Sequence, residues 1–313
     1  MNKNSKIFVA GHNGLVGSAL VKKLKELGYT NLITKSHSEL DLTSEMNTKI
    51  FFSLEHPEYV FDCAALVGGI QANNSRGADF MLNNLKIQNN IIECCHEFKT
   101  TKLLFLGSSC IYPRNSPQPI KEEYLLTSEL EKTNEPYAIA KICGLKLCEY
   151  FGKQYNDNFI SVMPTNLYGS SQDNYDLETS HVLPAMIRKI HDAKINNDKS
   201  VTLWGDGTPM REFLHVDDLA ESLIFLMLNY NEMEPINIGT GKDISIFELA
   251  MKIKSVIDYN GLIEWNTTKP NGTLRKLLNV NKIHNLGWKH KIELDEGLKI
   301  TYDRFLENTP KKL

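Results

Sequence analysis

Residues 6–17 read Lys6-Ile-Phe-Val-Ala10-Gly11-His12-Asn13-Gly14-Leu15-Val16-Gly17, and the architecture expected for the whole chain follows from them. The apolar run before Gly11 predicts a short buried strand, and apolar residues at helical spacing up to Gly28 predict a helix. The turn between them has the spacing G-x-x-G-x-x-G, one position away from the dinucleotide-binding fingerprint. Glycines in such a turn let the backbone approach a pyrophosphate at the helix N-terminus. A glycine-rich turn without a ligand is the alternative for this stretch alone.

Strands and helices alternate through the rest of the chain, which predicts the α/β class. Further buried strands are expected at residues 31–34, 59–65, 102–106 and 159–163. Nearly continuous apolar runs of this kind are typical of a parallel sheet that is covered on both faces. We therefore predict a Rossmann doubly wound parallel sheet.

The length of 313 residues exceeds the usual size of one domain, so a second part is expected. Residues 1–169, joined by about 212–240, are predicted to form the dinucleotide-binding Rossmann domain. Residues 170–211 and 241–313 are predicted to form a smaller C-terminal α/β substrate-binding lobe that closes over the edge of the sheet.

The composition is that of an ordinary globular protein. It has 42% hydrophobic and 23% charged residues and a formal net charge of −3, which gives no general attraction to nucleic acid or membranes. No apolar run approaches the length that spans a bilayer. The six cysteines form no C-x-x-C pair and show no zinc-ligand spacing. We expect a cytoplasmic protein with reduced thiols and no metal.

A phenol and an ammonium lie four residues apart in Asn134-Glu-Pro-Tyr137-Ala-Ile-Ala-Lys141. On a helix these two side chains share one face. The cation is then expected to draw the pKa of Tyr137 down from about 10, so that its hydroxyl can donate a proton to a carbonyl near neutral pH. A partly buried tyrosine beside a solvated lysine is the alternative for the pair alone.

The strand predicted at residues 102–106 ends in Gly107-Ser108-Ser109-Cys110. Side chains just beyond the carboxyl end of such a strand meet a cofactor that lies over the first glycine turn. Ser108 is placed to donate to a substrate carbonyl together with Tyr137. A nucleophilic role for Ser108 or Cys110 would require a histidine base, and the G-x-S-x-G elbow of the hydrolases is missing.

The end of the second predicted strand bears on the choice of cofactor. A Rossmann fold that binds NAD places an acid there, whereas this chain has Lys35, Ser36 and His37. Basic side chains can receive the 2′-phosphate, so NADP(H) is favoured over NAD(H). The alternative is that Lys35 is merely solvated and that His37 is mostly neutral at pH 7.

Taken in order, these motifs resemble the GDP-L-fucose synthase family of extended short-chain dehydrogenase/reductases. The resemblance runs from residue 7 to about residue 308. The matching segments are residues 103–113 (LLFLGSSCIYP), 133–141 (TNEPYAIAK), 161–169 (SVMPTNLYG) and 207–218 (GTPMREFLHVDD).

Carried over by position, the resemblance implies that Tyr137 is the proton donor and that Lys141 is its pKa partner and the anchor of the nicotinamide ribose. It implies that Ser108 is a second donor to the C4 carbonyl and that Cys110 and His181 shuttle protons at C3 and C5. The implied cofactor contacts are Gly11, His12, Asn13, Gly14, Leu15, Val16, Gly17, Lys35, His37, Asp41, Leu42, Leu106, Gly107, Ser108, Ser109, Lys141, Pro164, Thr165, Asn166, Leu167 and His181. The implied substrate contacts are Asn134, Lys189, Trp204, Arg211, Asn271 and Lys276.

The resemblance implies an NADPH-dependent 4-reductase with 3,5-epimerase activity on a GDP-4-keto-6-deoxy sugar. A ketone at C4 acidifies the hydrogens on both neighbouring carbons, and its enolate needs hydrogen-bond donors, so one site can epimerise and then reduce. The expected partners are a GDP-sugar and a second copy of the chain, through the helices predicted near residues 79–98 and 136–151. No nucleic acid or membrane partner is expected.

Four positions depart from the family pattern. The arginine of the glycine turn is Asn13 here, the second-strand arginine falls on His37, a diphosphate-contact arginine falls on Lys189, and an aspartate falls on Asn271. The loop at residues 170–179 differs as well. Two alternatives therefore stay open: a 4-reductase without epimerase activity that acts on a GDP-4-keto-6-deoxy-heptose, and an inactive nucleotide-sugar-binding protein.

Overall fold

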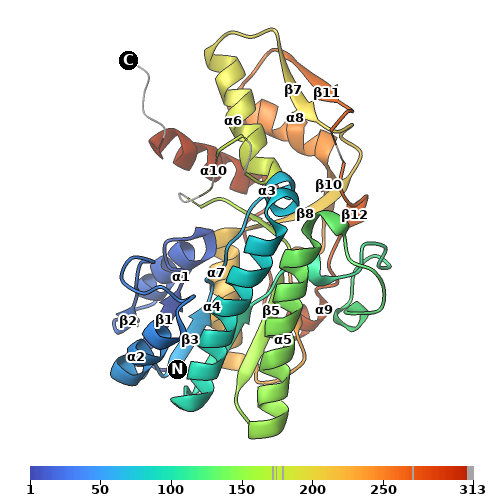
Figure 1. Ribbon diagram of the computed structural model, residues 1–313. Helices are drawn as coiled ribbons and strands as arrows, with labels where there is room; N and C mark the ends of the chain where they lie inside the picture. Colours follow the sequence, from blue (N-terminus) through green and yellow to red (C-terminus); the bar gives the residue numbers. More distant parts are fainter. Residues whose placement is uncertain (171–172, 174, 178–179, 270, 309–313) are drawn as a thin grey trace.

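The computed structural model describes residues 1–170, 173, 175–177, 180–269 and 271–308. Its centre is a six-stranded sheet in the order β2-β1-β3-β4-β5-β9, with every neighbouring pair parallel (Figure 1). The strand order reverses at β1, where a doubly wound fold binds its ligand beyond the carboxyl ends of the strands. The strands are β1 (Ile7–Ala10), β2 (Leu32–Ile33), β3 (Tyr59–Asp62), β4 (Lys102–Leu106), β5 (Phe159–Pro164) and β9 (Ile236–Ile238).

Helices cover both faces of this sheet. Two helices, α1 and α7, pack together on one face, and α4 lies between α2 and α5 on the other (Figure 1). Because water is excluded from both faces, every residue of β4 and β5 is buried. The helices are α1 (Leu15–Glu26), α2 (Glu45–Glu55), α3 (Ile70–Ser75), α4 (Gly77–Glu97), α5 (Glu135–Tyr155) and α7 (Val216–Asn229). Short 3-10 turns are η1 (Ser109–Ile111), η2 (Glu122–Tyr124) and η3 (Lys132–Asn134).

A second group of elements lies above the sheet in Figure 1 and has an apolar core of its own. Two parallel strands, β7 and β11, and the helices α6, α8 and α10 surround that core, while β8 pairs with β6, β10 and β12. The strands are β6 (Asn166–Tyr168), β7 (Ser200–Trp204), β8 (Met210–His215), β10 (Asp243–Ser245), β11 (Leu262–Asn266) and β12 (Arg275–Lys276). The helices are α6 (Val182–Ile195), α8 (Ile246–Ile257), α9 (Asn281–Asn285) and α10 (Leu294–Asn308).

The α/β class and the parallel sheet are confirmed, with differences at the element bounds. The second strand covers two residues instead of 31–34, and a separate helix, α3, begins where a loop was expected at residues 67–70. Sequence patterns do not predict the short strands β6, β8, β10, β11 and β12. The division into residues 1–169 with 212–240, and 170–211 with 241–313, stays a prediction. Within the described residues, no helix is long and apolar enough to cross a membrane.

One buried carboxylate connects the two groups of elements. Glu212 of β8 is fully buried, and its Oε1 accepts hydrogen bonds from the backbone N–H groups of Thr240 at 2.6 Å and Gly241 at 2.7 Å. Its Oε2 accepts from the backbone N–H of Leu278 at 3.0 Å. A Cβ on Gly239 would lie 2.2 Å from Glu212 Oε1, so the chain after β9 can run this close only as glycine.

Candidate active site

The glycine turn lies at the switch point of the sheet, between β1 and α1. Gly11 has a φ of +75°, and a Cβ there would come within 2.8 Å of the backbone of Ala64, just after β3. A Cβ on Gly17 would lie 2.2 Å from the carbonyl oxygen of Gly11. Both positions therefore require glycine, and the turn leaves its backbone open to a ligand.

The N-terminus of α1 is suited to a phosphate. Gly14 is the N-cap residue, and among the described residues no side chain caps it and no acidic residue lies in the first helical turn, which starts with Leu15 and Val16. The ring atom Nδ1 of His12 is buried without a hydrogen-bond partner in the described part of the chain. Unpaired backbone N–H groups and an unpaired imidazole nitrogen are groups that a pyrophosphate can engage. The turn with Asn13 thus fits the diphosphate of a dinucleotide.

The predicted 2′-phosphate residues lie beyond β2. Lys35 is half-buried, and His37 is exposed, with its Nδ1 3.8 Å from Oδ1 of Asp41. The backbone oxygen of Leu42 accepts a hydrogen bond from Nδ2 of Asn90 at 2.8 Å, which joins this segment to α4. Lys35 and His37, together with the predicted cofactor contacts Asp41 and Leu42, are therefore placed along the one segment that follows β2.

Sequence reasoning missed an acid in the same segment. Oε2 of Glu39 accepts hydrogen bonds from the backbone N–H of Ser36 at 2.7 Å and from its hydroxyl at 2.6 Å. These bonds, helped by the charge of Lys35, hold the pKa of Glu39 below its usual range. The carboxylate is thus already engaged by the turn that carries the basic residues.

Three predicted catalytic side chains meet beyond the carboxyl end of β4. The hydroxyl of Ser108 accepts a hydrogen bond from the backbone N–H of Cys110 at 3.3 Å and lies beside the Cys110 thiol. Burial raises the pKa of Tyr137, and the negative charge that Cys110 acquires as a thiolate raises it further. A hydroxyl, a thiol and a phenol thus share one site.

The position of Lys141 corrects one expectation. We expected this lysine to lower the pKa of Tyr137, yet the pKa of Tyr137 lies above its ordinary value. The Lys141 side chain is buried, and its Nζ donates to the backbone oxygen of Leu106 at 2.8 Å and lies 4.8 Å from the centre of the Phe105 ring. Its strongest favourable charge interaction is with Asp62. The Lys141 ammonium is therefore held at the end of β4 by the backbone oxygen of Leu106.

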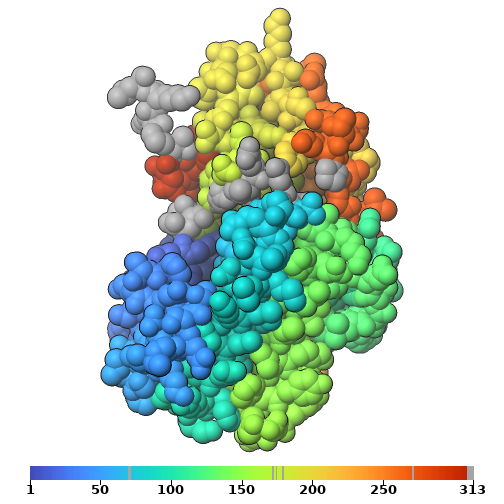
Figure 2. Space-filling model, viewed as in Figure 1, coloured from blue at the N-terminus to red at the C-terminus, as the bar shows by residue number. Residues whose placement is uncertain are grey.

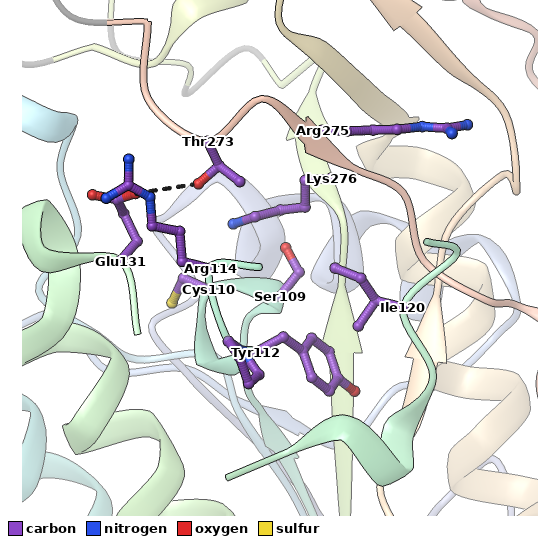
Figure 3. A pocket seen from close by; sticks show the side chains of 10 residues that line it. Ser109, Cys110, Tyr112, Arg114, Ile120, Glu131, Thr273, Arg275 and Lys276 are labelled. Atoms are coloured by element: carbon purple, nitrogen blue, oxygen red, sulfur yellow. Dashed lines mark hydrogen bonds and ion pairs between the residues drawn. The ribbon is translucent and has the colours of Figure 1, made fainter. Parts of the chain in front are cut away.

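Cys110 also lines a narrow cavity, together with Lys276 (Figure 3). Lys276 points into it from β12, whereas its neighbour Arg275 points away and donates to Oδ2 of Asp243 at 2.6 Å. At the rim, Oε2 of Glu131 is 3.2 Å from Nε of Arg114. Lys276 was predicted as a substrate contact, and the structure places its ammonium near the thiol.

The predicted contacts at the strand ends lie around the same site. Gly107 and Ser109 follow β4 directly, and Leu106 ends it. On the neighbouring strand, Pro164 ends β5, Thr165 donates its backbone N–H to Ile238 at 2.9 Å, and Asn166 and Leu167 open β6. These residues line the edge over which the glycine turn also lies.

The predicted diphosphate residues lie in the second group of elements. Nζ of Lys189, on α6, is 5.2 Å from the ring centre of Trp204, which ends β7. Nζ of Lys269 is 5.0 Å from the same ring, a residue that sequence reasoning missed. Burial, and then the charge of Lys269, hold the pKa of Lys189 below its usual value. Two ammonium groups therefore lie close to one aromatic ring, an arrangement that an anion could bridge.

Three further predicted substrate contacts are placed as follows. Arg211 is half-buried on β8 beside Lys276 of β12. Oδ1 of Asn271 accepts from the backbone N–H of Asp206 at 3.0 Å, which fixes the turn after β7. Asn134 is the residue before α5, and its Oδ1 is buried without a hydrogen-bond partner in the part of the chain that the structure describes.

His181 is exposed and directly precedes α6. In the loop before it, which departs from the family pattern, residues 171–172, 174 and 178–179 lie outside the described residues. Among the residues that are described, no group of three or more His, Cys, Asp or Glu side chains is arranged to hold a metal ion.

Residues 7–239 match the NAD dependent epimerase/dehydratase family. The chain belongs to that family. GDP-L-fucose synthase 1 of Arabidopsis thaliana is 54% identical over 307 residues, which cover 98% of this chain and 95% of that protein. The GDP-L-fucose synthase of Escherichia coli is 48% identical over 312 residues, with 97% of each chain covered. A similar solved structure is MlghC, a GDP-mannoheptose C4 reductase from Campylobacter jejuni with NADP bound. The two chains are 42% identical with a TM-score of 0.91, and the match covers 98% of this chain and 99% of MlghC.

The family match and the GDP-L-fucose synthase relatives together confirm the predicted resemblance and the predicted enzyme class, an NADP-dependent oxidoreductase of nucleotide sugars. NADP(H) is confirmed as the cofactor. The roles of individual residues stay predictions.

Proposed function

We propose that this enzyme is a GDP-4-keto-6-deoxy-sugar 3,5-epimerase and 4-reductase that produces a GDP-L-fucose-type sugar. The observation that supports it best is the meeting of the Cys110 thiol with the hydroxyls of Ser108 and Tyr137. A reductase needs only donors to the carbonyl. A thiol in the same site adds a group that can remove a proton from carbon.

For the reduction step, NADPH would supply the hydride for C4 when bound. Tyr137 then gives its proton to the C4 oxygen, and Ser108 donates a hydrogen bond to that oxygen. Lys141, whose Nζ donates to the backbone oxygen of Leu106, would hold the nicotinamide ribose of the bound cofactor. The raised pKa of Tyr137 keeps its proton in place until the alkoxide develops.

In the epimerisation steps, Cys110 and His181 act at C3 and C5. One of them removes a proton from carbon, and the electron pair moves to the C4 oxygen, where Ser108 and Tyr137 hold the enolate. The other returns a proton on the opposite face. The ketone is regenerated and is ready for reduction.

The GDP part of the substrate would lie between the two groups of elements. Lys189 and Lys269 repel each other across Trp204, and a diphosphate would relieve this repulsion. Arg211 and Lys276 supply further positive charge toward the sugar, and the unpaired Oδ1 of Asn134 can accept from a sugar hydroxyl. Residues 170–211 and 241–313 would then form the substrate-binding lobe.

A second candidate is a 4-reductase alone that acts on a GDP-heptose, because the similar MlghC structure is a heptose C4 reductase. The two functions differ at carbon. In D₂O, an epimerase places solvent deuterium at C3 and C5 of the product, since each removed proton is replaced from solvent. NADPH oxidation with a GDP-4-keto-6-deoxy sugar, without deuterium at either carbon, would contradict the epimerase function and favour the reductase.

A homodimer is the remaining part of the proposal. Leu82 on α4 and Tyr150 on α5 are exposed, and Leu85 and Ile139 on the same helices are half-buried. Two such helices, side by side on one face of the sheet, can form a four-helix bundle with a second copy.

A further inference from the structure

The cavity beside Cys110 brings one ammonium group to one thiol (Figure 3). Lys276 reaches it from β12, which is held against β8 by the pairing of Lys276 with Arg211. Successive side chains of a strand point to opposite sides, so Arg275 leaves the cavity and its guanidinium lies at Asp243. The backbone therefore fixes Lys276 toward the thiol.

Other charges near the cavity are already engaged or act less strongly on Cys110. Glu131 attracts Lys276, but Oε2 of Glu131 is paired with Arg114 at 3.2 Å and accepts from the hydroxyl of Thr273 at 3.5 Å. Arg211 repels Lys276. From α5, the groups that face Cys110 are Tyr137 and Lys141.

The charge balance at the thiol singles out the lysine. Burial raises the pKa of Cys110, and Lys276 opposes this more strongly than the Ser108 hydroxyl or Lys141 does. In return, Cys110 is the strongest influence that favours the charged form of Lys276, whose pKa burial lowers. Each group thus stabilises the ionised form of the other.

We propose that Lys276 is a positioning residue for the epimerisation step, where its ammonium opposes the effect of burial on Cys110 and so favours the thiolate that removes a proton from C3 or C5. The thiolate accepts that proton and becomes a thiol, while the electron pair of the C–H bond moves to the C4 oxygen. The inference rests on the proposed function, because it takes Cys110 as the base. It adds a role for Lys276 beyond contact with the substrate.

Alkylation of the substrate-free enzyme tests this charge interaction directly. We expect Cys110 of the wild type to react with iodoacetamide as a thiolate. Mass spectrometry of the Cys110 peptide measures the rate of this reaction across pH 6–10. Lys276→Met should slow alkylation at pH 7.5 by about tenfold and move its pH midpoint up by about one unit, the size of effect that a nearby opposite charge produces. Lys276→Arg should restore most of the rate, and Arg275→Met is the matched control that should leave it unchanged.

Activity provides the second measurement. Lys276→Met should slow deuterium incorporation at C3 and C5 more than it slows NADPH oxidation with an already epimerised 4-keto sugar. A change in KM alone would mean that Lys276 only binds substrate, which overturns the proposal. So would an alkylation profile of Lys276→Met equal to the wild type, or a wild-type Cys110 that stays unmodified up to pH 9. If the wild type incorporates no deuterium, the epimerase function fails, but the alkylation profiles still decide whether Lys276 controls the thiol.

Discussion

Burial controls the charge of the reactive side chains at the carboxyl edge of the sheet. It raises the pKa of Tyr137 and of Cys110 and lowers that of Lys141. Burial thus disfavours the charged form of all three side chains, and the charge of each depends on its partners. Motif spacing identifies these residues, but it does not reveal which partner each one has, because Lys141 lies against Leu106 and Lys276 comes from a segment 166 positions beyond Cys110.

Tyr137→Phe tests the proton donor. The ring packs as before and only the hydroxyl is lost, so NADPH affinity should stay near normal while turnover falls by about 10²–10⁴-fold. NADPH oxidation gives the rate, and NADPH fluorescence gives the affinity. Wild-type turnover in the variant would remove Tyr137 from the mechanism.

Asp62 is a fully buried acid that sequence reasoning missed, because it lies within the apolar run that predicts the third strand. Its Oδ1 accepts from the backbone N–H of Ala64 at 3.2 Å, and within the described residues its Oδ2 has no hydrogen-bond partner. Burial raises its pKa to about 6, although Lys141 opposes the shift. A buried, poorly solvated carboxylate thus lies beside Lys141 at neutral pH.

The raised pKa of Asp62 makes stability depend on pH. Between about pH 4 and pH 6 the Asp62 carboxyl holds its proton in the folded state but not in the unfolded state. The contribution of the protonated Asp62 to stability is therefore complete below about pH 4 and is lost as the pH rises through about 6. Asp62→Asn removes this dependence. Relative to wild type, the free energy of unfolding of the variant should be about 2 kcal/mol higher, that is more stabilising, at pH 7.0 than at pH 4.5. Urea unfolding at both values measures it, with the exposed Asp303→Asn as control; equal differences at both values would refute the shifted pKa.

At the scale of elements, the sequence predicts those strands and helices that interactions between neighbouring residues determine. The first strand, the glycine turn and α1 could be predicted, since three glycines and helical spacing act within a few residues, and so could α5 with Tyr137 and Lys141 on it. The strands β8, β10 and β12 could not, because β10 and β12 have three and two residues and are held by pairing with β8 across long sequence distances. The position of Lys276 depends on this pairing.

Glu212→Gln tests the connection between β8 and the segments after β9 and β12. The amide offers one acceptor oxygen where the carboxylate offers two, so an N–H of Thr240, Gly241 or Leu278 would lose its partner in the interior. We expect a loss of about 2–4 kcal/mol in the free energy of unfolding, measured by urea denaturation. Glu264→Gln, at an exposed position of β11, is the matched control and should change stability by less than about 0.5 kcal/mol. A loss in Glu212→Gln no larger than in the control would exclude this role.

At the scale of the whole molecule, the candidate site draws its residues from two groups of elements. The sheet supplies the glycine turn and the reactive side chains, and the second group supplies Lys189, Trp204 and Lys276. The segment after η1 joins them, since Ile120 donates its backbone N–H to Leu277 at 2.7 Å and accepts from Asn279 at 2.8 Å. Figure 2 shows residues 110–135 (green) in contact with the orange C-terminal segment on this side of the molecule.

The outer face of α4 and α5 exposes Leu82 and Tyr150, and the proposed dimer would cover it. Leu82 is 55% exposed, and a lysine there would place a charge in the centre of an apolar interface, which is costly unless the charge is paired. We expect wild type to be a dimer by light scattering at micromolar concentration and Leu82→Lys to shift it toward monomer, while NADPH affinity and melting temperature stay near wild type. Leu54→Lys is the matched control, because Leu54 is 74% exposed on α2, away from the proposed interface. A monomeric wild type would contradict the proposed dimer. A dimer that Leu82→Lys and Leu54→Lys affect equally would place the interface elsewhere.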